Sequence, residues 1–407
     1  MTATLLDSKS SWFRLGLCVL AGTVVNIGMW AAILVLPQIQ ADFGIDRADA
    51  SISFTCAMIG FAAGNLILGR WVDRYGIAPI LAFSALTLGV CYGLSALAPN
   101  IWIFAALQIP IGFATASGFG PLIADISHWF KSFRGIAIAA TASGNYVSGT
   151  IWPQLLKSTI ETDGWRTAFV IVALCSVALV LPIAHFLRAR LVSDVNAVRE
   201  PPQKQISLTN QQLTALLLIA GVGCCMAMAM PQVHIVAYCV DLGFGAGVGA
   251  EMLSLMLFAG IFSRLLSGML ADTIGAVPTL LIGSVLQCLA LFLYIPFDGL
   301  VSLYIVSLVF GLSQGGIVPS YAMIVREYMP AEEAGKRIGI LMVATVGGMA
   351  IGGWVSGWIY DLTGSYQIAF MHGIAWNFIN IAIMLFILMK SRPARQKRDL
   401  GRALAAE

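Results

Sequence analysis

Apolar runs of about 20 residues recur along almost the whole of this 407-residue sequence, with short polar breaks between them. A run of that length can cross about 30 Å of hydrocarbon as one helix. The predicted spans lie at 14–37, 51–70, 77–98, 101–126, 135–157, 167–189, 212–239, 250–271, 277–296, 300–325, 338–360 and 367–390. The pattern therefore predicts an all-α polytopic membrane protein with about twelve transmembrane helices in two six-helix halves.

Composition supports the same class. The chain is 59% hydrophobic and only 11% charged, whereas soluble domains are about 25% charged. The first apolar run has no small-residue cleavage pattern followed by a soluble domain, so we expect it to remain as the first span. The eight cysteines are scattered without metal-ligand spacing, which favours small buried side chains over a metal site.

A polar stretch divides the chain near its middle. We expect an N-terminal six-helix half at 1–189, a cytoplasmic linker at 190–211, a C-terminal six-helix half at 212–390 and a basic cytoplasmic tail at 391–407. On this map 19 of the 23 Lys and Arg residues share the side of both termini, and only Arg264 lies within a span. This bias predicts a multi-pass protein of the cell (inner) membrane with both termini cytoplasmic.

The two predicted halves share a motif that is repeated after 199 residues. A Gly-xxx-Asp-xx-Gly turn ends the second helix of each half, at Gly69, Asp73 and Gly76 and again at Gly268, Asp272 and Gly275. The same offset relates Gly112 to Gly311 and Asn65 to Arg264. Two homologous halves predict a parallel repeat about an axis along the membrane normal, with a site between the halves near mid-depth.

The first copy of the motif, Gly-Arg-Trp-Val-Asp-Arg-Tyr-Gly at 69–76, strongly resembles the loop signature of the major facilitator superfamily. Segments at 129–135, 231–244 and 260–275 resemble the branch of monocarboxylate transporters and oxalate–formate antiporters. The resemblance implies alternating access, in which two halves rock about a central site. It also implies a conformational latch in the repeated loops, here Gly69, Asp73, Arg74, Gly76, Gly268 and Asp272.

Arg264 is the main candidate for the central site. It lies eight residues before Asp272, about 12 Å deeper along a helix. An arginine near mid-membrane costs roughly 2.5 to 3.5 kcal/mol, so we expect it to face a cavity, where its planar fork suits a carboxylate. The resembled branch carries a substrate-binding arginine on this helix. The alternative is that Arg264 pairs with helix-end carbonyl groups or snorkels inward.

Further polar and aromatic residues within the spans are candidates for the same cavity. The residues expected to bind substrate beside Arg264 are Asn65, Phe119, Asn145, Tyr146, Gln314 and Tyr321, with Gln108 as an additional candidate. For the polar members the alternative role is to join helices, since a hydrogen bond between spans contributes about 0.6 kcal/mol.

The charges in the spans restrict the substrate. No Asp or Glu in the central part of a predicted span would neutralise Arg264, which predicts an anionic substrate. Oxalate-type members of the resembled branch are expected to carry a second cation on the eleventh helix. The eleventh helix predicted here, 338–360, has no Lys or Arg, and one cation favours a monocarboxylate such as lactate or pyruvate.

Proton coupling requires a different group. Eukaryotic monocarboxylate carriers place an acid one turn before this arginine, where the present sequence has Gly260. Asp241 and His234 are the candidates instead, because with Tyr238 they are spaced to share one helix face and histidine titrates near neutral pH. The alternatives are a helix cap for Asp241 and a hydrogen-bonded structural role for His234.

These features predict a secondary active transporter of small organic anions, with proton coupling or anion exchange. An enzyme is not expected, because the sequence has no phosphate loop, Walker motif or catalytic triad. We expect a monomer in the lipid bilayer that binds an anionic small molecule and, if coupled, protons, without cofactor, metal or nucleic acid. The alternatives are uptake of a larger heteroaromatic or vitamin-like nutrient, export of an amphiphile, and a non-transporting receptor.

Overall fold

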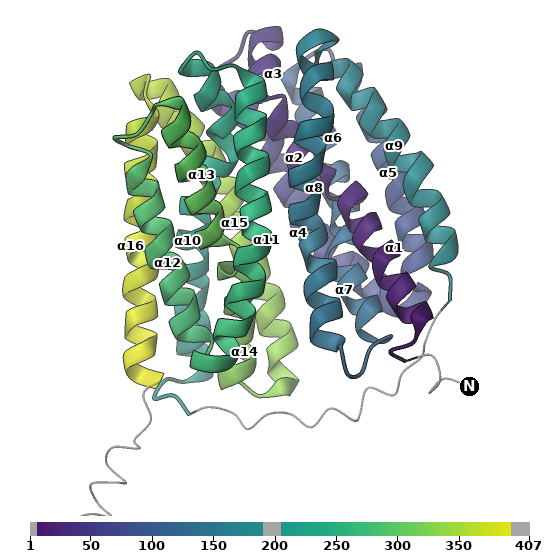
Figure 1. The fold of residues 1–407 in the computed structure, drawn as a ribbon, viewed down its shortest axis with the longest axis vertical. Helices are drawn as coiled ribbons and strands as arrows, with labels where there is room; N and C mark the ends of the chain where they lie inside the picture. The colour runs from purple at the N-terminus through teal and green to yellow at the C-terminus, as the bar shows by residue number, and fades with distance from the viewer. Residues whose placement is uncertain (1–5, 190–204, 392–407) are drawn as a thin grey trace, which may run out of the picture.

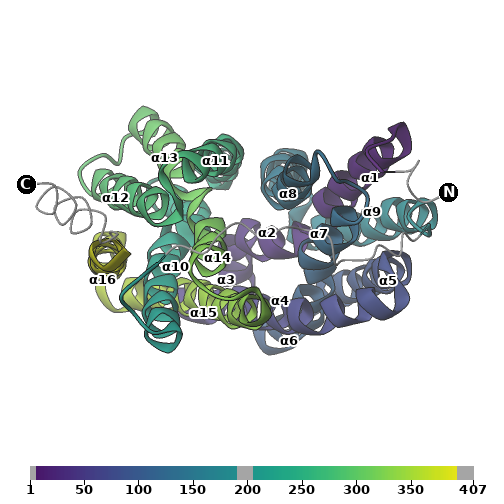
Figure 2. The same cartoon turned by 90° about the horizontal axis from the view of Figure 1, so that it is seen from below.

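Two helical bundles lie side by side in the computed structural model, which describes residues 6–189 and 205–391. The first bundle contains residues 9–186 and the second residues 210–391 (Figures 1 and 2). Both ends of the described chain lie on one face, which we call the termini face; the opposite face is the far face. This arrangement confirms the predicted all-α fold of two six-helix halves.

The first bundle follows the six predicted N-terminal spans, of which the first and the fourth are broken into shorter helices. Its elements are α1 (Lys9–Val25), α2 (Ile27–Leu34), α3 (Leu36–Phe43), α4 (Arg47–Tyr75), α5 (Ile77–Ala96), α6 (Ile101–Thr115), the 3-10 helix η1 (Ala116–Gly118), α7 (Gly120–Ser127), α8 (Arg134–Thr162) and α9 (Gly164–Phe186). The break before α3 precedes Pro37, whose missing amide proton is tolerated in the first turn of a helix.

The second bundle repeats this order with an unbroken first helix. Its elements are α10 (Asn210–Asp241), α11 (Ala246–Ile274), α12 (Ala276–Leu293), α13 (Leu300–Gln314), α14 (Ile317–Tyr328), α15 (Ala331–Thr363) and α16 (Tyr366–Ser391). The predicted linker and basic tail fall mainly at 190–204 and 392–407, outside the described residues.

Eleven helical stretches in the described ranges are long and apolar enough to cross a membrane. α8, predicted as the span 135–157, is not one of them, although its 29 residues would suffice. Its polar side chains include Thr141, Asn145, Thr150 and Gln154, and the helix packs against α11 of the second bundle. The face of α8 that packs against the other half accommodates such residues.

The sequence repeat recurs in the helix packing. A Cβ atom on Gly112 would overlap the carbonyl oxygen of Ala57, and one on Gly311 would overlap that of Met256. Ala57 and Met256 are themselves 199 positions apart. Close approach of two backbones requires a small residue at the contact, so glycine stands where α6 crosses α4 and where α13 crosses α11.

The glycine that ends each repeated motif is required by the turn. Gly76 and Gly275 have φ values of 85° and 95°, which side-chain-bearing residues rarely adopt. Their amides donate to the carbonyl oxygens of Val72 (2.7 Å) and Ala271 (2.9 Å) and so satisfy the last turns of α4 and α11.

Candidate functional site

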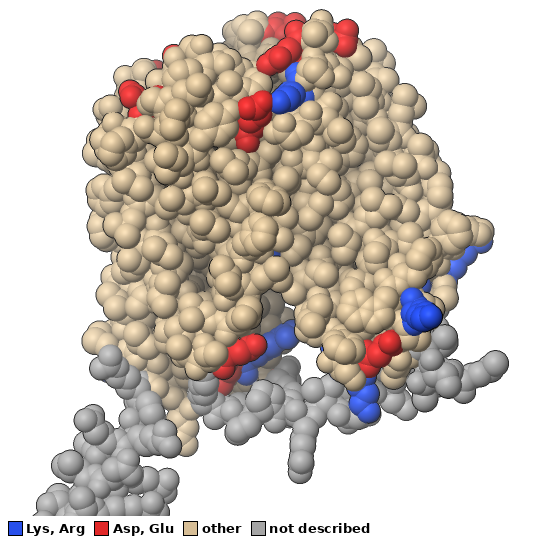
Figure 3. Space-filling model, viewed as in Figure 1, with Lys and Arg blue, Asp and Glu red and all other residues tan. Residues whose placement is uncertain are grey.

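A cavity of about 320 Å³ lies between the two bundles. Residues of α2, α4, α7 and α8 line it on one side, and residues of α10, α11, α14 and α15 line it on the other. On the termini face the molecular surface is hollowed between the bundles (Figure 3).

Arg264 lies in the wall of this cavity and connects the bundles. Its Nε donates to the carbonyl oxygen of Gly315 (3.3 Å), and its Nη1 donates to that of Ala142 on α8 (2.8 Å). The guanidinium carbon lies 4.3 Å from the ring centroid of Tyr146. Gly260 permits this approach, since a Cβ atom there would lie 3.2 Å from the Tyr146 ring.

One partner of Arg264, the Gly315 carbonyl, is of the helix-end type in the alternative interpretation, whereas Ala142 lies within α8, and neither carbonyl neutralises the charge. Gly315 caps α13, where a carbonyl lacks its helical partner. Both acceptor carbonyls are neutral. Among the residues that line the cavity in the described part of the chain, Arg264 is the one charged side chain. The cavity is therefore electropositive at this point.

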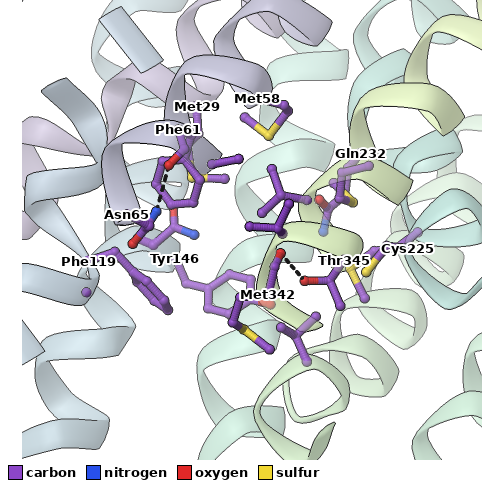
Figure 4. A pocket seen from close by; sticks show the side chains of 18 of the residues that line it. Met29, Met58, Phe61, Asn65, Phe119, Tyr146, Cys225, Gln232, Met342 and Thr345 are labelled. Atoms are coloured by element: carbon purple, nitrogen blue, oxygen red, sulfur yellow. Dashed lines mark hydrogen bonds between the residues drawn. The ribbon is translucent and has the colours of Figure 1, made fainter. Parts of the chain in front are cut away.

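In the described lining of the cavity, the aromatic side chains all belong to the first bundle: Trp30, Phe61, Phe119 and Tyr146. Figure 4 shows Phe61, Phe119 and Tyr146 on the side opposite Gln232. The ring centroids of Phe61 and Phe119 are 6.4 Å apart. Trp30 is fixed because its Nε1 lies 3.2 Å from the backbone oxygen of Asn145 and 3.2 Å from the Oδ1 of the same residue.

The second bundle contributes thioether and aliphatic side chains, namely Met228, Met342, Val343, Val346 and Met349. It also presents the amide of Gln232, whose Nε2 donates to Oε1 of the buried Gln314 at 2.6 Å. The hydroxyl of Thr345 donates to the carbonyl oxygen of Met342 in its own helix (2.8 Å; Figure 4).

The structure brings five of the expected substrate-binding residues to this cavity: Arg264, Asn65, Phe119, Asn145 and Tyr146. The Nδ2 of Asn65 donates to the carbonyl oxygen of Phe61 at 2.9 Å, so its Oδ1 is the atom left for other partners. Gln314 lies one layer behind the wall, against Gln232.

Tyr321 and Gln108 do not line the cavity, which corrects their expected position. Tyr321 is fully buried, and its hydroxyl donates to Oδ1 of Asn380 on α16 (2.8 Å). Gln108 is also fully buried, and its Nε2 donates to the carbonyl oxygen of Phe104 (3.3 Å). Both side chains point into the core of their own bundle, which the position of a residue along a span does not reveal.

The sequence interpretation missed several lining residues, including Trp30, Gln232 and the methionines of α10 and α15. The alternating methionines of the stretch 226–230 were the available signal. Methionine is flexible and polarisable and is often used at adaptable binding surfaces.

The expected latch residues lie at the termini-face ends of α4 and α11. Gly69 and Gly268 have open space where a side chain would be, and the Arg74 guanidinium lies 5.3 Å from the Tyr75 ring centroid. Asp73 and Asp272 are exposed there.

Asp241 and His234 belong to a hydrogen-bonded cluster on the side of the cavity nearer the far face. Arg47 of the first bundle donates to both carboxylate oxygens of Asp241 (2.9 and 3.1 Å) and to the hydroxyl of Tyr366 (2.5 Å). His234 lies with Nδ1 3.1 Å from that hydroxyl and Nε2 2.7 Å from the carbonyl oxygen of Gly353. Because the carbonyl only accepts, Nε2 carries a proton and donates to it.

The far face is closed by further contacts between the bundles. Asp361, near the end of α15, accepts from the backbone amides of Arg47 (2.9 Å) and Ala48 (2.7 Å), which begin α4. Lys157 on α8 pairs with Glu251 on α11 at 2.5 Å. These contacts shut the cavity from the far face while it stays open towards the termini face.

A second acidic residue makes a similar contact between the bundles, from the first bundle to the second. Glu161, at the end of α8, lies against the start of α11, so that a Cβ atom on Gly247 would overlap its carboxylate. Each bundle thus places an acid from its fifth span at the N-terminal end of a helix in the other bundle, where the helix dipole favours negative charge.

Known proteins resemble this chain along most of its length. The Rattus norvegicus protein named "Monocarboxylate transporter 13" is 26% identical over 65% of this chain and 63% of its own length. The Escherichia coli (strain K12) protein named "Sialic acid transporter NanX" is 24% identical over 78% of this chain and 79% of its own length.

Solved structures and family profiles agree on the fold. The crystal structure of the nucleoside transporter NupG superposes with a TM-score of 0.72 at 15% identity, over 92% of this chain and 99% of that one. The sequence profile described as Major Facilitator Superfamily matches residues 18–263 and 241–405. This multi-pass membrane protein therefore belongs to the Major Facilitator Superfamily and is a transporter.

Proposed function

We propose that the protein is a secondary transporter of organic monocarboxylates and that Arg264 binds the carboxylate. The observation that carries this proposal is the guanidinium of Arg264, which no acidic side chain of the described cavity lining compensates. A guanidinium can donate two parallel hydrogen bonds to a carboxylate, and its present carbonyl partners lack the charge that an anion would supply. Two relatives are named for transport of organic acids, which supports the same class.

One cation suits one carboxylate. None of the described α15 residues that line the cavity is Lys or Arg. They are Gly339, Met342, Val343, Thr345 and neighbouring apolar residues. A second carboxylate would be desolvated there without a partner, at a cost of several kcal/mol. We therefore favour a monocarboxylate over a dicarboxylate.

Alternating access would operate between the two faces. The bias of Lys and Arg supports a cytoplasmic position for the termini face in the cell (inner) membrane, so the present state would exchange substrate with the cytoplasm. When the bundles rock, the contacts of Arg47 with Asp241 would break. The latch residues would then make contacts that hold the termini face closed. They are Gly69, Asp73, Arg74, Gly76, Gly268 and Asp272.

Proton coupling is proposed for the cluster around Asp241 and His234. Moving one net charge across 100 mV is worth about 2.3 kcal/mol, and one co-transported proton would cancel the charge of a monoanion. Separation of the bundles would remove Arg47 from Asp241, and a proton could take the place of the guanidinium. Anion exchange would need no such step.

Uptake of radiolabelled benzoate and lactate into proteoliposomes tests the role of Arg264. We expect Arg264→Gln to lower uptake of the transported acid at least 100-fold and Arg264→Lys to restore part of it. Arg188→Gln, which removes an exposed arginine on the termini face, is the matched control. Wild-type uptake by Arg264→Gln would eliminate the proposed carboxylate contact.

A larger apolar cargo is the second candidate, favoured by the aromatic and thioether lining of the cavity. If that cargo is neutral, transport will not depend on Arg264.

A further inference from the structure

We infer that the carboxylate bound by Arg264 belongs to an acid with a flat aromatic body, an arene monocarboxylate, and not to a three-carbon acid. This inference rests on the proposed function and adds the shape and polarity of the rest of the substrate. It follows from how the wall of the cavity is divided between the two bundles.

The position of Tyr146 sets the direction of the bound acid. Its ring lies 4.3 Å from the guanidinium carbon of Arg264, so an anion on the free side of the guanidinium lies beside an aromatic residue. Phe119 and Phe61 continue the same wall, with ring centroids 6.4 Å apart. Aromatic rings pair in offset or edge-to-face geometry at centroid separations of about 4.5–7 Å, and an aryl group extending from Arg264 would meet this wall.

The facing wall suits the other side of such a ring. Met228, Met342 and Met349 line it, and thioether sulfur makes favourable contacts with aromatic rings, with the sulfur about 5 Å from the ring. Val343 and Val346 complete an apolar surface. A flat aromatic ring between these two walls would bury apolar surface on both of its faces. Such burial contributes about 25 cal/mol of binding free energy per Å².

A short hydroxy or keto acid would use little of this cavity. The volume of about 320 Å³ lies within the roughly 300–1,000 Å³ of cavities that bury drug-sized ligands. Several nearby polar groups already have partners within the protein: Asn145 accepts from Trp30, Asn65 donates to Phe61, and Thr345 donates to Met342. Lactate would leave most of the aromatic and thioether wall facing water.

The lining also discriminates against aromatic amino acids. An α-ammonium group beside the carboxylate would approach the positive guanidinium of Arg264, and no Asp or Glu lines the described cavity to receive it. The expected cargo therefore has one negative charge, an aromatic body and no amine.

Equilibrium binding to the purified full-length protein, measured by titration calorimetry, tests the inference. The probes are lactate, benzoate, 2-naphthoate, the neutral benzamide and phenylalanine. We expect each arene acid to bind at least tenfold tighter than lactate and than phenylalanine, and benzamide to bind at least tenfold more weakly than benzoate. Phe119→Val should reduce the ratio of benzoate to lactate affinity at least fivefold. Phe378→Val, at an exposed phenylalanine of α16 outside the cavity, should leave the ratio unchanged.

The outcomes separate this inference from the proposed function. If lactate binds as tightly as the arene acids, or if neither arene acid binds at millimolar concentration, the aromatic body is ruled out. Loss of lactate binding in Arg264→Gln would still support the carboxylate contact. If arene acids and benzamide bind equally well to wild type and to Arg264→Gln, the carboxylate contact is ruled out instead.

Discussion

The two bundles present the cavity with equivalent positions but different side chains. Among the lining residues that the structure describes, four pairs are related by the 199-residue offset: Met29 and Met228, Asn65 and Arg264, Phe119 and Val318, and Tyr146 and Thr345. One pair is conserved in type, and the other three differ in charge or in aromatic character.

The two bundles contribute different kinds of side chain to the cavity. The first bundle supplies every aromatic residue of the described lining, and the second supplies its one charge and most of its methionines. By contrast, Gly112 at a helix crossing and Gly76 at a turn recur in the second bundle as Gly311 and Gly275. The repeat thus keeps the helix packing similar, while divergence at the lining gives the cavity a charged side on the second bundle and an aromatic side on the first. Under the proposed function, this difference would orient an anionic ligand with its charged end towards the second bundle.

Arg264→Asn gives the second bundle the residue of the first and should have the largest effect. Removing one partner of a buried charge pair costs about 2–5 kcal/mol, so we expect the dissociation constant of benzoate to rise about 100-fold or more. Titration calorimetry provides the measurement, and an unchanged melting temperature of the protein shows that it is folded. A dissociation constant within threefold of wild type would contradict a charged side of the cavity on the second bundle.

Gly112→Ala and Gly311→Ala test whether the frame is equivalent in both bundles. A methyl group at either position overlaps a carbonyl oxygen of the facing helix, and overpacking of this kind costs about 1–3 kcal/mol. We expect similar decreases in melting temperature for both variants. Gly16→Ala, at a helical glycine with open space around it, serves as the control. If only one of the two variants has a lowered melting temperature, the repeat does not extend to helix packing.

Asn65→Arg gives the first bundle the residue of the second. A second guanidinium should tighten binding of a dicarboxylate such as succinate about tenfold relative to benzoate, since one added charge-assisted hydrogen bond contributes about 1.5–3 kcal/mol before the cost of burying the new charge. Asn65→Gln is the control without charge. If the ratio of the two affinities does not change, Asn65 is not placed to contact the substrate.

Asp361→Asn should have the smallest effect, on the closure of the far face. The carboxylate accepts two amide hydrogen bonds at the start of α4, and a cap of this kind is worth about 1 kcal/mol. Spin labels at the exposed positions Thr162 and Thr363 should show a larger fraction of long distances across the far face. Glu161→Gln, the equivalent change at the other bundle, should act in the same direction; a shift to shorter distances in either variant would refute the role of these acids.

Local sequence features were sufficient to predict the fold. Apolar run length and glycine turns are properties of neighbouring residues, and the 199-residue offset is visible when two such local patterns are compared; each was found in the structure. The cavity lining depends on the rotation of each helix about its axis, which the sequence specified less well. Tyr321 and Arg264 both lie within spans, yet only Arg264 reaches the cavity.

Contacts between the bundles were the least predictable feature. Arg47 lies beside Asp46 and Asp49 in the sequence, but its carboxylate partner is Asp241, 194 residues away. The pairing arises only when α4 and α10 meet, and no local pattern encodes that meeting.

The hydrogen bond from Arg264 to the carbonyl oxygen of Ala142 has a consequence for turnover. It joins the bundles at the level of the cavity, and a carboxylate bound to the guanidinium would compete with it. Ligand binding would then lower the cost of separating the bundles, as differential affinity for two states requires. Under the proposed function, an unloaded carrier would keep this bond and return slowly, so counterflow of one acid against another would run faster than net flux.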